Sequence, residues 1–253
     1  MRSVTAILLL SFIIILPVFS QGEIDEEVRI YSFRNEITYA VHLNSNGFGA
    51  GFRYAKRQNA SKKSLYETDF NFIKHAKEIK IHIPYVQQNG NGYVYGKLIN
   101  FGTLHLGIGS QKEIFWKEDK GGISIRYFYS FGPSFGFQKP IYYEVLDQDS
   151  GNILRKKFEE HTTFDRKAPF YYGLNEISLV PGIYAKFGFT FEFGKSKNVF
   201  NAIETGVLTD AYIKKVNIMA NKYNSWIYPA FFISYRFGKI VDAKAKPSKE
   251  PDK

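Results

Sequence analysis

The chain has 253 residues, a formal net charge of +10 and no cysteine. The lack of cysteine excludes disulfide bonds, thiolate catalysis and thiolate metal sites together. The positive charge is spread along the chain without a nucleic-acid-binding motif, so we expect no nucleic acid among the partners.

Aromatic residues are unusually frequent, with 24 Phe and 18 Tyr. A soluble domain would have to bury them, whereas a transmembrane β-barrel places them on its lipid-facing wall and in girdles at the two membrane interfaces. Charged residues still make up 23% of the chain, and a barrel interior, its loops and its turns can hold them. The composition therefore favours a membrane barrel.

The first 20 residues read as an export signal. A single positive charge at Arg2 precedes an apolar run that ends in small residues, and the run is shorter than the roughly 20 residues a spanning helix needs. We expect cleavage near Ser20, a mature chain that starts at Gln21, and a periplasmic segment over residues 21–35. An uncleaved membrane anchor is the alternative.

Eight later segments show period-two alternation or turn-bounded β composition, which is typical of strands. They cover residues 36–43, 48–56, 65–72, 103–115, 122–137, 182–193, 199–211 and 226–237. The Asn46-Gly47 pair suits a tight hairpin turn between the first two. Apart from that hairpin, short connections alternate with long ones, as expected for periplasmic turns and outer loops.

The sequence therefore predicts an all-β fold over residues 36–237, an eight-stranded antiparallel up-and-down transmembrane β-barrel of the outer membrane. Its last segment places Ile227, Ile233 and Phe237 on one apolar face. The Lys- and Pro-rich tail, residues 238–253, is too polar to pack and is expected to be disordered. A soluble β-sandwich or lipocalin-like barrel with the apolar face turned inward is the alternative.

The same alternation sends charged side chains into the lumen. An eight-stranded barrel is only wide enough for its own side chains, so we expect a plugged interior with paired charges, since unpaired ones would be strongly destabilising. The predicted luminal charge network consists of Arg53, Glu67, Asp69, Glu113, Arg126, Lys186, Glu192, Glu204 and Arg236. A gated or proton-conducting lumen is the functional alternative, and a sugar pore is disfavoured by the narrow width.

An enzyme would need a catalytic constellation, and the sequence offers little. His161 follows Glu159 and Glu160 in the longest outer loop, which makes these three the candidates for a surface hydrolase of lipid or peptide. No Gly-x-Ser-x-Gly elbow accompanies them. We expect no catalytic site and keep the hydrolase, and a narrow channel, as alternatives.

The other histidines have structural explanations. His42 and His105 fall on the inward face of predicted strands, and His75 and His82 are seven residues apart in a loop without metal-site spacing. Gly107–Gly109 lies inside a strand and is no dinucleotide loop, so its small residues are expected to relieve crowding in a narrow barrel. The sequence predicts no metal site and no cofactor.

Four runs resemble a family of uncharacterised outer-membrane β-barrel proteins of Bacteroidota: KHAKEIK at 74–80, YVYGKLINF at 93–101, LGIGSQ at 106–111 and GPSFGFQKPIYY at 132–143. The resemblance covers residues 67–143 and departs from the family pattern at Ala76, where proline is expected, and in the Lys-rich tail. It implies an outer-membrane location and a lineage, but no catalytic residues.

Small barrels of that lineage serve as accessory subunits of envelope machines such as outer-membrane assembly or secretion complexes, which is an analogy at the level of fold. Two outer loops concentrate Tyr, Lys and Pro, a composition suited to protein contact, although the tyrosines would equally suit an aromatic girdle. The loop binding candidates are Tyr93, Tyr95, Lys97, Lys139, Tyr142 and Tyr143. We expect a structural or accessory binding component that contacts outer-membrane lipid, lipopolysaccharide and other outer-membrane proteins.

Overall fold

The computed structural model describes residues 35–59, 61–81, 93–117, 122–146, 153–159, 166–194, 199–220 and 224–241. The predicted export signal, residues 21–34 of the predicted periplasmic segment and residues 242–253 of the predicted tail lie outside these ranges. Within them, no helix is long and apolar enough to cross a membrane.

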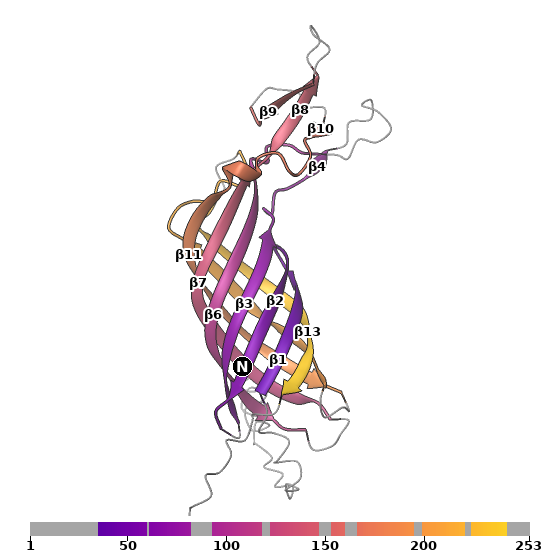
Figure 1. The fold of residues 1–253 in the computed structure, drawn as a ribbon, viewed down its shortest axis with the longest axis vertical. Helices are drawn as coiled ribbons and strands as arrows, with labels where there is room; N and C mark the ends of the chain where they lie inside the picture. Colours follow the sequence, from indigo (N-terminus) through magenta and orange to yellow (C-terminus); the bar gives the residue numbers. More distant parts are fainter. Residues whose placement is uncertain are drawn as a thin grey trace, which may run out of the picture. The chain divides into compact units, whose positions relative to one another are not determined.

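Eight antiparallel strands close into a barrel (Figure 1). Each strand pairs with its neighbours in chain order, and β1 and β13 close the cylinder from Asn35↔Val241 to Asn44↔Phe232. The prediction of an eight-stranded antiparallel up-and-down barrel is confirmed. In order around the barrel the strands are β1 (Asn35–Asn44), β13 (Ile227–Val241), β12 (Val199–Tyr212), β11 (Ser178–Phe193), β7 (Ser124–Pro140), β6 (Ile99–Phe115), β3 (Lys62–Ile73) and β2 (Gly47–Arg57).

The last strand is longer than the apolar pattern indicates. β13 continues to Val241, so the prediction of a disordered tail from residue 238 is wrong for residues 238–241. Lys239 pairs with Ile37 on one side and with Val199 on the other, so backbone hydrogen bonding continues where the alternation of side chains fades. Asn35, placed by the sequence in the periplasmic segment, belongs to β1 for the same reason.

The hairpin between β1 and β2 is tight, but its two turn residues are Ser45 and Asn46 because Asn44 pairs with Gly47. The prediction that Asn46 and Gly47 form the turn is wrong by one residue. Gly47 is needed for another reason, since a Cβ there would lie 1.8 Å from the carbonyl oxygen of Phe72 in β3.

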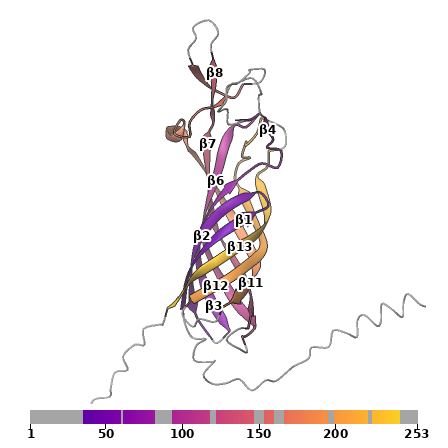
Figure 2. The same ribbon diagram turned by 90° about the vertical axis from the view of Figure 1, so that its right-hand side faces the viewer.

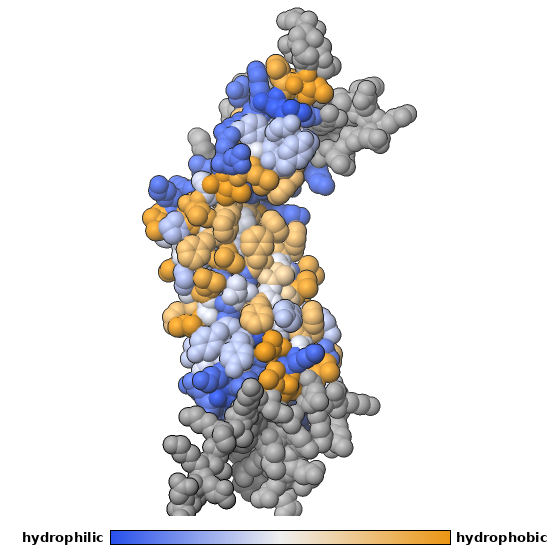
Figure 3. Space-filling view, in the orientation of Figure 1, coloured by the Kyte–Doolittle hydropathy of each residue, from blue (hydrophilic) through white to orange (hydrophobic). Residues whose placement is uncertain are grey.

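The wall of the barrel is apolar on its outer side. Figure 3 shows apolar side chains over the barrel wall on the face in view, with hydrophilic residues gathered toward its two ends. A large apolar side chain that is 39% to 61% exposed projects outward from every barrel strand: Tyr39, Phe52, Tyr66, Ile108, Tyr129, Phe187, Ile203 and Ile233. An apolar surface that encircles the whole barrel far exceeds the patches of about 300–600 Å² found on soluble monomers.

The long connections fold into small sheets at one end of the barrel, opposite the short connections that follow β2, β6 and β11 (Figures 1 and 2). One sheet pairs β4 (Lys80–Ile81) with β5 (Tyr93–Val94). The other has the order β10 (Arg166–Lys167), β8 (Tyr142–Leu146), β9 (Ile153–Lys157), and a 3-10 turn, η1 (Leu174–Glu176), follows it in the chain. We call the described parts of residues 74–98, 141–177 and 213–226 the cap.

Candidate functional site

One group of charges in the lumen joins two arginines to two glutamates. Arg53 on β2 donates to both carboxylate oxygens of Glu204 on β12, at 2.5 and 3.2 Å, and also pairs with Glu67 on β3. Arg236 on β13 lies with Nε 3.0 Å from Oε2 of the same Glu204. None of the four side chains is more than 3% exposed, so their charges are balanced by one another rather than by water.

A second group is built around Arg126 on β7. Its guanidinium pairs with Glu36 on β1, Glu113 on β6 and Glu192 on β11. Lys63 on β3 also pairs with Glu36. Neither Glu36 nor Lys63 was in the predicted network. Lys63 was missed because the sequence pattern assigned it to a turn, whereas β3 begins at Lys62. Extending the inward phase of Glu67 back by four residues would have found Lys63.

A third group joins the inward histidines to carboxylates. Lys186 on β11 donates to Oδ2 of Asp69 at 2.8 Å, and His42 Nε2 lies 3.4 Å from Oδ1 of the same residue. His105 Nε2 lies 2.7 Å from Oδ1 of Asp210, an acid outside the predicted network. The structure thus places all nine predicted network residues in the lumen, each within an ion pair, and adds Glu36, Lys63 and Asp210 to them.

Glycines give the larger luminal side chains their space. A Cβ at Gly107 would lie 1.7 Å from the hydroxyl oxygen of Tyr184, and one at Gly51 would lie 1.9 Å from Oδ1 of Asp69. The Tyr184 ring stacks on His105 with 4.3 Å between centroids. Side chains therefore fill the lumen, and Tyr184 and Asp69 fit there because Gly107 and Gly51 carry no side chain.

Gly107→Ala is expected to destabilise the barrel by about 1–3 kcal/mol through overpacking. Its methyl group would overlap the Tyr184 hydroxyl, so adding Tyr184→Phe should recover part of the loss. Gly102→Ala is the control, because its Cβ would meet the Phe70 ring at 3.3 Å. Urea unfolding in lipid vesicles measures the stability of the three variants. A Gly107→Ala barrel as stable as the unaltered protein would contradict this packing.

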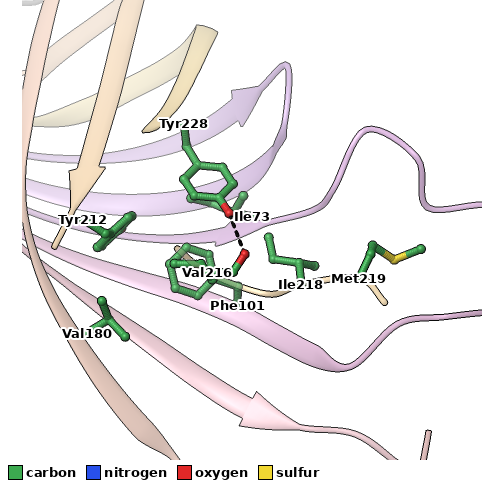
Figure 4. Packing of buried hydrophobic residues seen from close by; sticks show 8 residues of the cluster. All are labelled: Ile73, Phe101, Val180, Tyr212, Val216, Ile218, Met219 and Tyr228. Atoms are coloured by element: carbon green, nitrogen blue, oxygen red, sulfur yellow. Dashed lines mark hydrogen bonds between the residues drawn. The ribbon is translucent and has the colours of Figure 1, made fainter. Parts of the chain in front are cut away.

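The cap end of the lumen is closed by an apolar cluster contributed partly by the last long connection (Figure 4). Val216 and Ile218 are fully buried, and the Tyr228 hydroxyl donates to the carbonyl oxygen of Val216 at 3.1 Å. Phe101 packs edge-on against Tyr212 with ring centroids 5.3 Å apart. The sequence did not predict this closure, because residues 212–225 read only as an outer loop.

The loop binding candidates divide into accessible and buried side chains. Tyr95 is 47% exposed and packs on Phe158. The Tyr142 hydroxyl donates to Glu176, which also accepts from Lys157, and these two hydrogen bonds lower the pKa of the Glu176 carboxyl. These residues lie at the surface of the cap, where a partner could reach them.

Two of the candidates are buried, unlike Tyr95. Tyr143 is 1% exposed, and its hydroxyl donates to the carbonyl oxygens of Lys97 and Val94. Lys139 is 6% exposed. Of the two remaining candidates, Lys97 pairs with Glu78 at 2.6 Å. Tyr93 belongs to β5, where its backbone pairs with Ile81 of β4. Composition alone could not separate a tyrosine that faces solvent from one that joins two loops.

The residues proposed for a surface hydrolase are mostly outside the described part of the chain. His161 and Glu160 lie there, and Glu159 is exposed. His82 also lies outside, while the ring Nδ1 of His75 accepts from the Lys77 backbone N–H at 3.2 Å. Among the described residues, no three His, Asp or Glu side chains are grouped so that they could hold a metal ion.

No protein-family model matches the sequence, and a search of curated proteins finds no relative. Among solved structures, Neisserial surface protein A is 11% identical, with a TM-score of 0.37 over 82% of this chain and 97% of that protein. Ail, the attachment invasion locus protein of Yersinia pestis, is 8% identical, with a TM-score of 0.37 over 83% and 99%. The N-terminal barrel domain of Pseudomonas aeruginosa OprF is 7% identical, with a TM-score of 0.35 over 81% and 98%. The strand pairing of the chain itself defines the barrel.

Proposed function

We propose that the protein is an integral outer-membrane β-barrel with a filled lumen, whose cap binds other components of the cell envelope. One observation carries this proposal: the polarity of the barrel is inverted. Apolar side chains such as Phe187 and Ile233 are exposed on the wall, while charged ones such as Arg236 and Glu204 are buried within it. Water would oppose this arrangement, whereas hydrocarbon stabilises it.

A closed barrel also meets the requirement that backbone N–H and C=O groups inside a membrane be hydrogen-bonded within the protein. Each barrel strand pairs on both sides, so no sheet edge is left to face lipid. Both described ends of the chain, Asn35 and Val241, pair with each other at the end that carries the short turns. With the predicted export signal, this supports short turns in the periplasm and a cap that faces outward.

The cap supports a role in binding rather than transport. Ile153 and Leu154 of β9 and Phe170 and Tyr171 near η1 are 42% to 63% exposed, and exposed aromatic and aliphatic side chains of this kind mark contact surfaces. Affinity purification from detergent-solubilised outer membrane tests the proposal. Co-purified envelope proteins that are lost when the cap is altered would support it, and recovery of the mature chain as a monomer in buffer without detergent would overturn it.

In a planar bilayer the purified protein is expected to show no steady ion conductance. Paired charges fill the lumen, and Val216 and Ile218 help to close its cap end. The recording should include an open porin as a positive control for insertion and current. A stable unitary conductance from the barrel would contradict a filled lumen and favour the narrow-channel alternative.

A further inference from the structure

Lysines of the cap and of the adjoining end of β7 lie around one buried tyrosine. The Tyr143 hydroxyl donates to the carbonyl oxygen of Lys97 at 2.7 Å, and the Tyr143 backbone pairs with Lys167 in β10. The same hydroxyl donates to the carbonyl oxygen of Val94, whose register partner in β4 is Lys80. Lys139 lies near the end of β7, where it pairs with Asn100, and the Ile141 N–H donates to the carbonyl oxygen of Leu98 at 2.9 Å, next to Lys97. The backbones of four lysine-bearing segments therefore lie close together.

Carboxylates do not balance these charges within the described part of the cap. Glu78 is the one acid with a salt bridge to the group, and it pairs with Lys97 at 2.6 Å. The neighbouring acids Glu144 and Glu176 pair with Arg155 and Lys157 instead. Lys80, Lys139 and Lys167 have no salt bridge to any residue the structure describes.

Lys139 is the most confined member of the group. It is 6% exposed, its Nζ lies 4.5 Å from the centroid of the Phe170 ring, and it donates a long hydrogen bond of 3.5 Å to the carbonyl oxygen of Pro140. An ammonium group removed from water is stable only with strong compensation. Burial, followed by the charges of Lys97 and Lys139, lowers the pKa of Lys167, which is the expected effect of like charges held together.

We propose that Lys80, Lys97 and Lys167 of the cap, with Lys139 at the end of β7, form a binding site for a phosphate-bearing anion. A phosphate or pyrophosphate group carries more than one negative charge and offers several acceptor oxygens, so it can meet several ammonium groups at once. This inference deepens the proposed function, since it names a ligand class for the cap. The phosphate belongs either to the headgroup of an outer-leaflet glycolipid or to a free phosphoester.

The test titrates inorganic pyrophosphate into the full chain in non-ionic detergent by calorimetry. The unaltered protein is expected to bind one equivalent saturably, and Lys139→Gln/Lys167→Gln is expected to weaken binding by about tenfold or more, as the loss of charge-assisted hydrogen bonds predicts. Lys214→Gln/Lys215→Gln is the matched control, because it removes the same charge from exposed lysines of another cap segment. It should change the affinity by less than about twofold.

Equal weakening in the two double variants would overturn the site, because it would show non-specific attraction by net charge. Absence of saturable binding in the unaltered protein would overturn it as well. Heat-dependent electrophoretic mobility reports whether each variant folds. If the loss of Lys139 disturbs folding, Lys167→Gln alone tests the site.

Native mass spectrometry of the protein released from lipid nanodiscs then separates the two sources. Retention of a bisphosphorylated glycolipid, but not of its dephosphorylated form, assigns the site to a lipid headgroup, and binding of pyrophosphate without such retention assigns it to a soluble phosphoester. The proposed function fails separately: a chain recovered as a soluble monomer would refute the membrane barrel and leave the pyrophosphate titration unaffected.

Discussion

Glu204→Ala is expected to destabilise the barrel by about 3–5 kcal/mol, the usual effect of removing one partner from a buried ion pair. The substitution leaves Arg53 and Arg236 sharing a single acid, Glu67, inside a lumen where neither guanidinium reaches water. It also removes the acceptor for the Thr190 hydroxyl, which lies 2.9 Å from Oε1 of Glu204. The free energy of unfolding in lipid vesicles, from urea titration, measures the effect.

Glu176→Gln is the matched control for this prediction. The Lys157–Glu176 pair has a similar separation, 2.6 Å, but its side chains are 58% and 46% exposed, so solvent screens the interaction and stability should change little. Equal effects of the two substitutions would mean that the lumen is hydrated well enough to solvate an unpaired arginine. That result would reopen the question of ion conduction.

Phe187→Lys is expected to lower the free energy of unfolding in vesicles by about 2–4 kcal/mol, the range measured for a cation near the bilayer midplane on a barrel wall. Phe187 is 44% exposed near the middle of β11 and has outward neighbours Val207 and Tyr129 on the adjacent strands. A lysine there would have to place its ammonium in hydrocarbon or bend away from it.

Val199→Lys provides the control for position. Val199 is 46% exposed, much like Phe187, but it is the first residue of β12, at the end with the short turns. Close to the interface the expected loss falls to about 0–1 kcal/mol. If Phe187→Lys were as well tolerated as Val199→Lys, the barrel wall would not be facing lipid, and the membrane assignment would be refuted.

Much of the barrel could be predicted from local pattern. Alternation places Ile233 and Phe237 outward and Ser234 and Arg236 inward, and the structure has them so. Local pattern carries no information about pairing between distant strands. Residues 238–241 are strand because β1 pairs with all four and β12 with the first two of them. The hairpin turn was placed one residue too far along because its register depends on the partner strand.

The sequence predicts that the luminal charged side chains point inward, but it does not predict which of them pair with one another. Arg53 and Glu204 are 151 residues apart in the chain and meet because closure of the cylinder brings β2 and β12 to face each other. The burial of Tyr143 and of Val216 likewise depends on loops that fold over the barrel end.

Successive Cβ atoms point to opposite faces of a strand, so side-chain alternation is a local property of adjacent residues. The number of strands and their lipid-facing side could therefore be predicted from the sequence alone. Contacts between distant segments carry no such local signature. The ion-pair partners, the closed cap end and the lysine cluster around Tyr143 therefore became visible only when all the strands and loops were placed together.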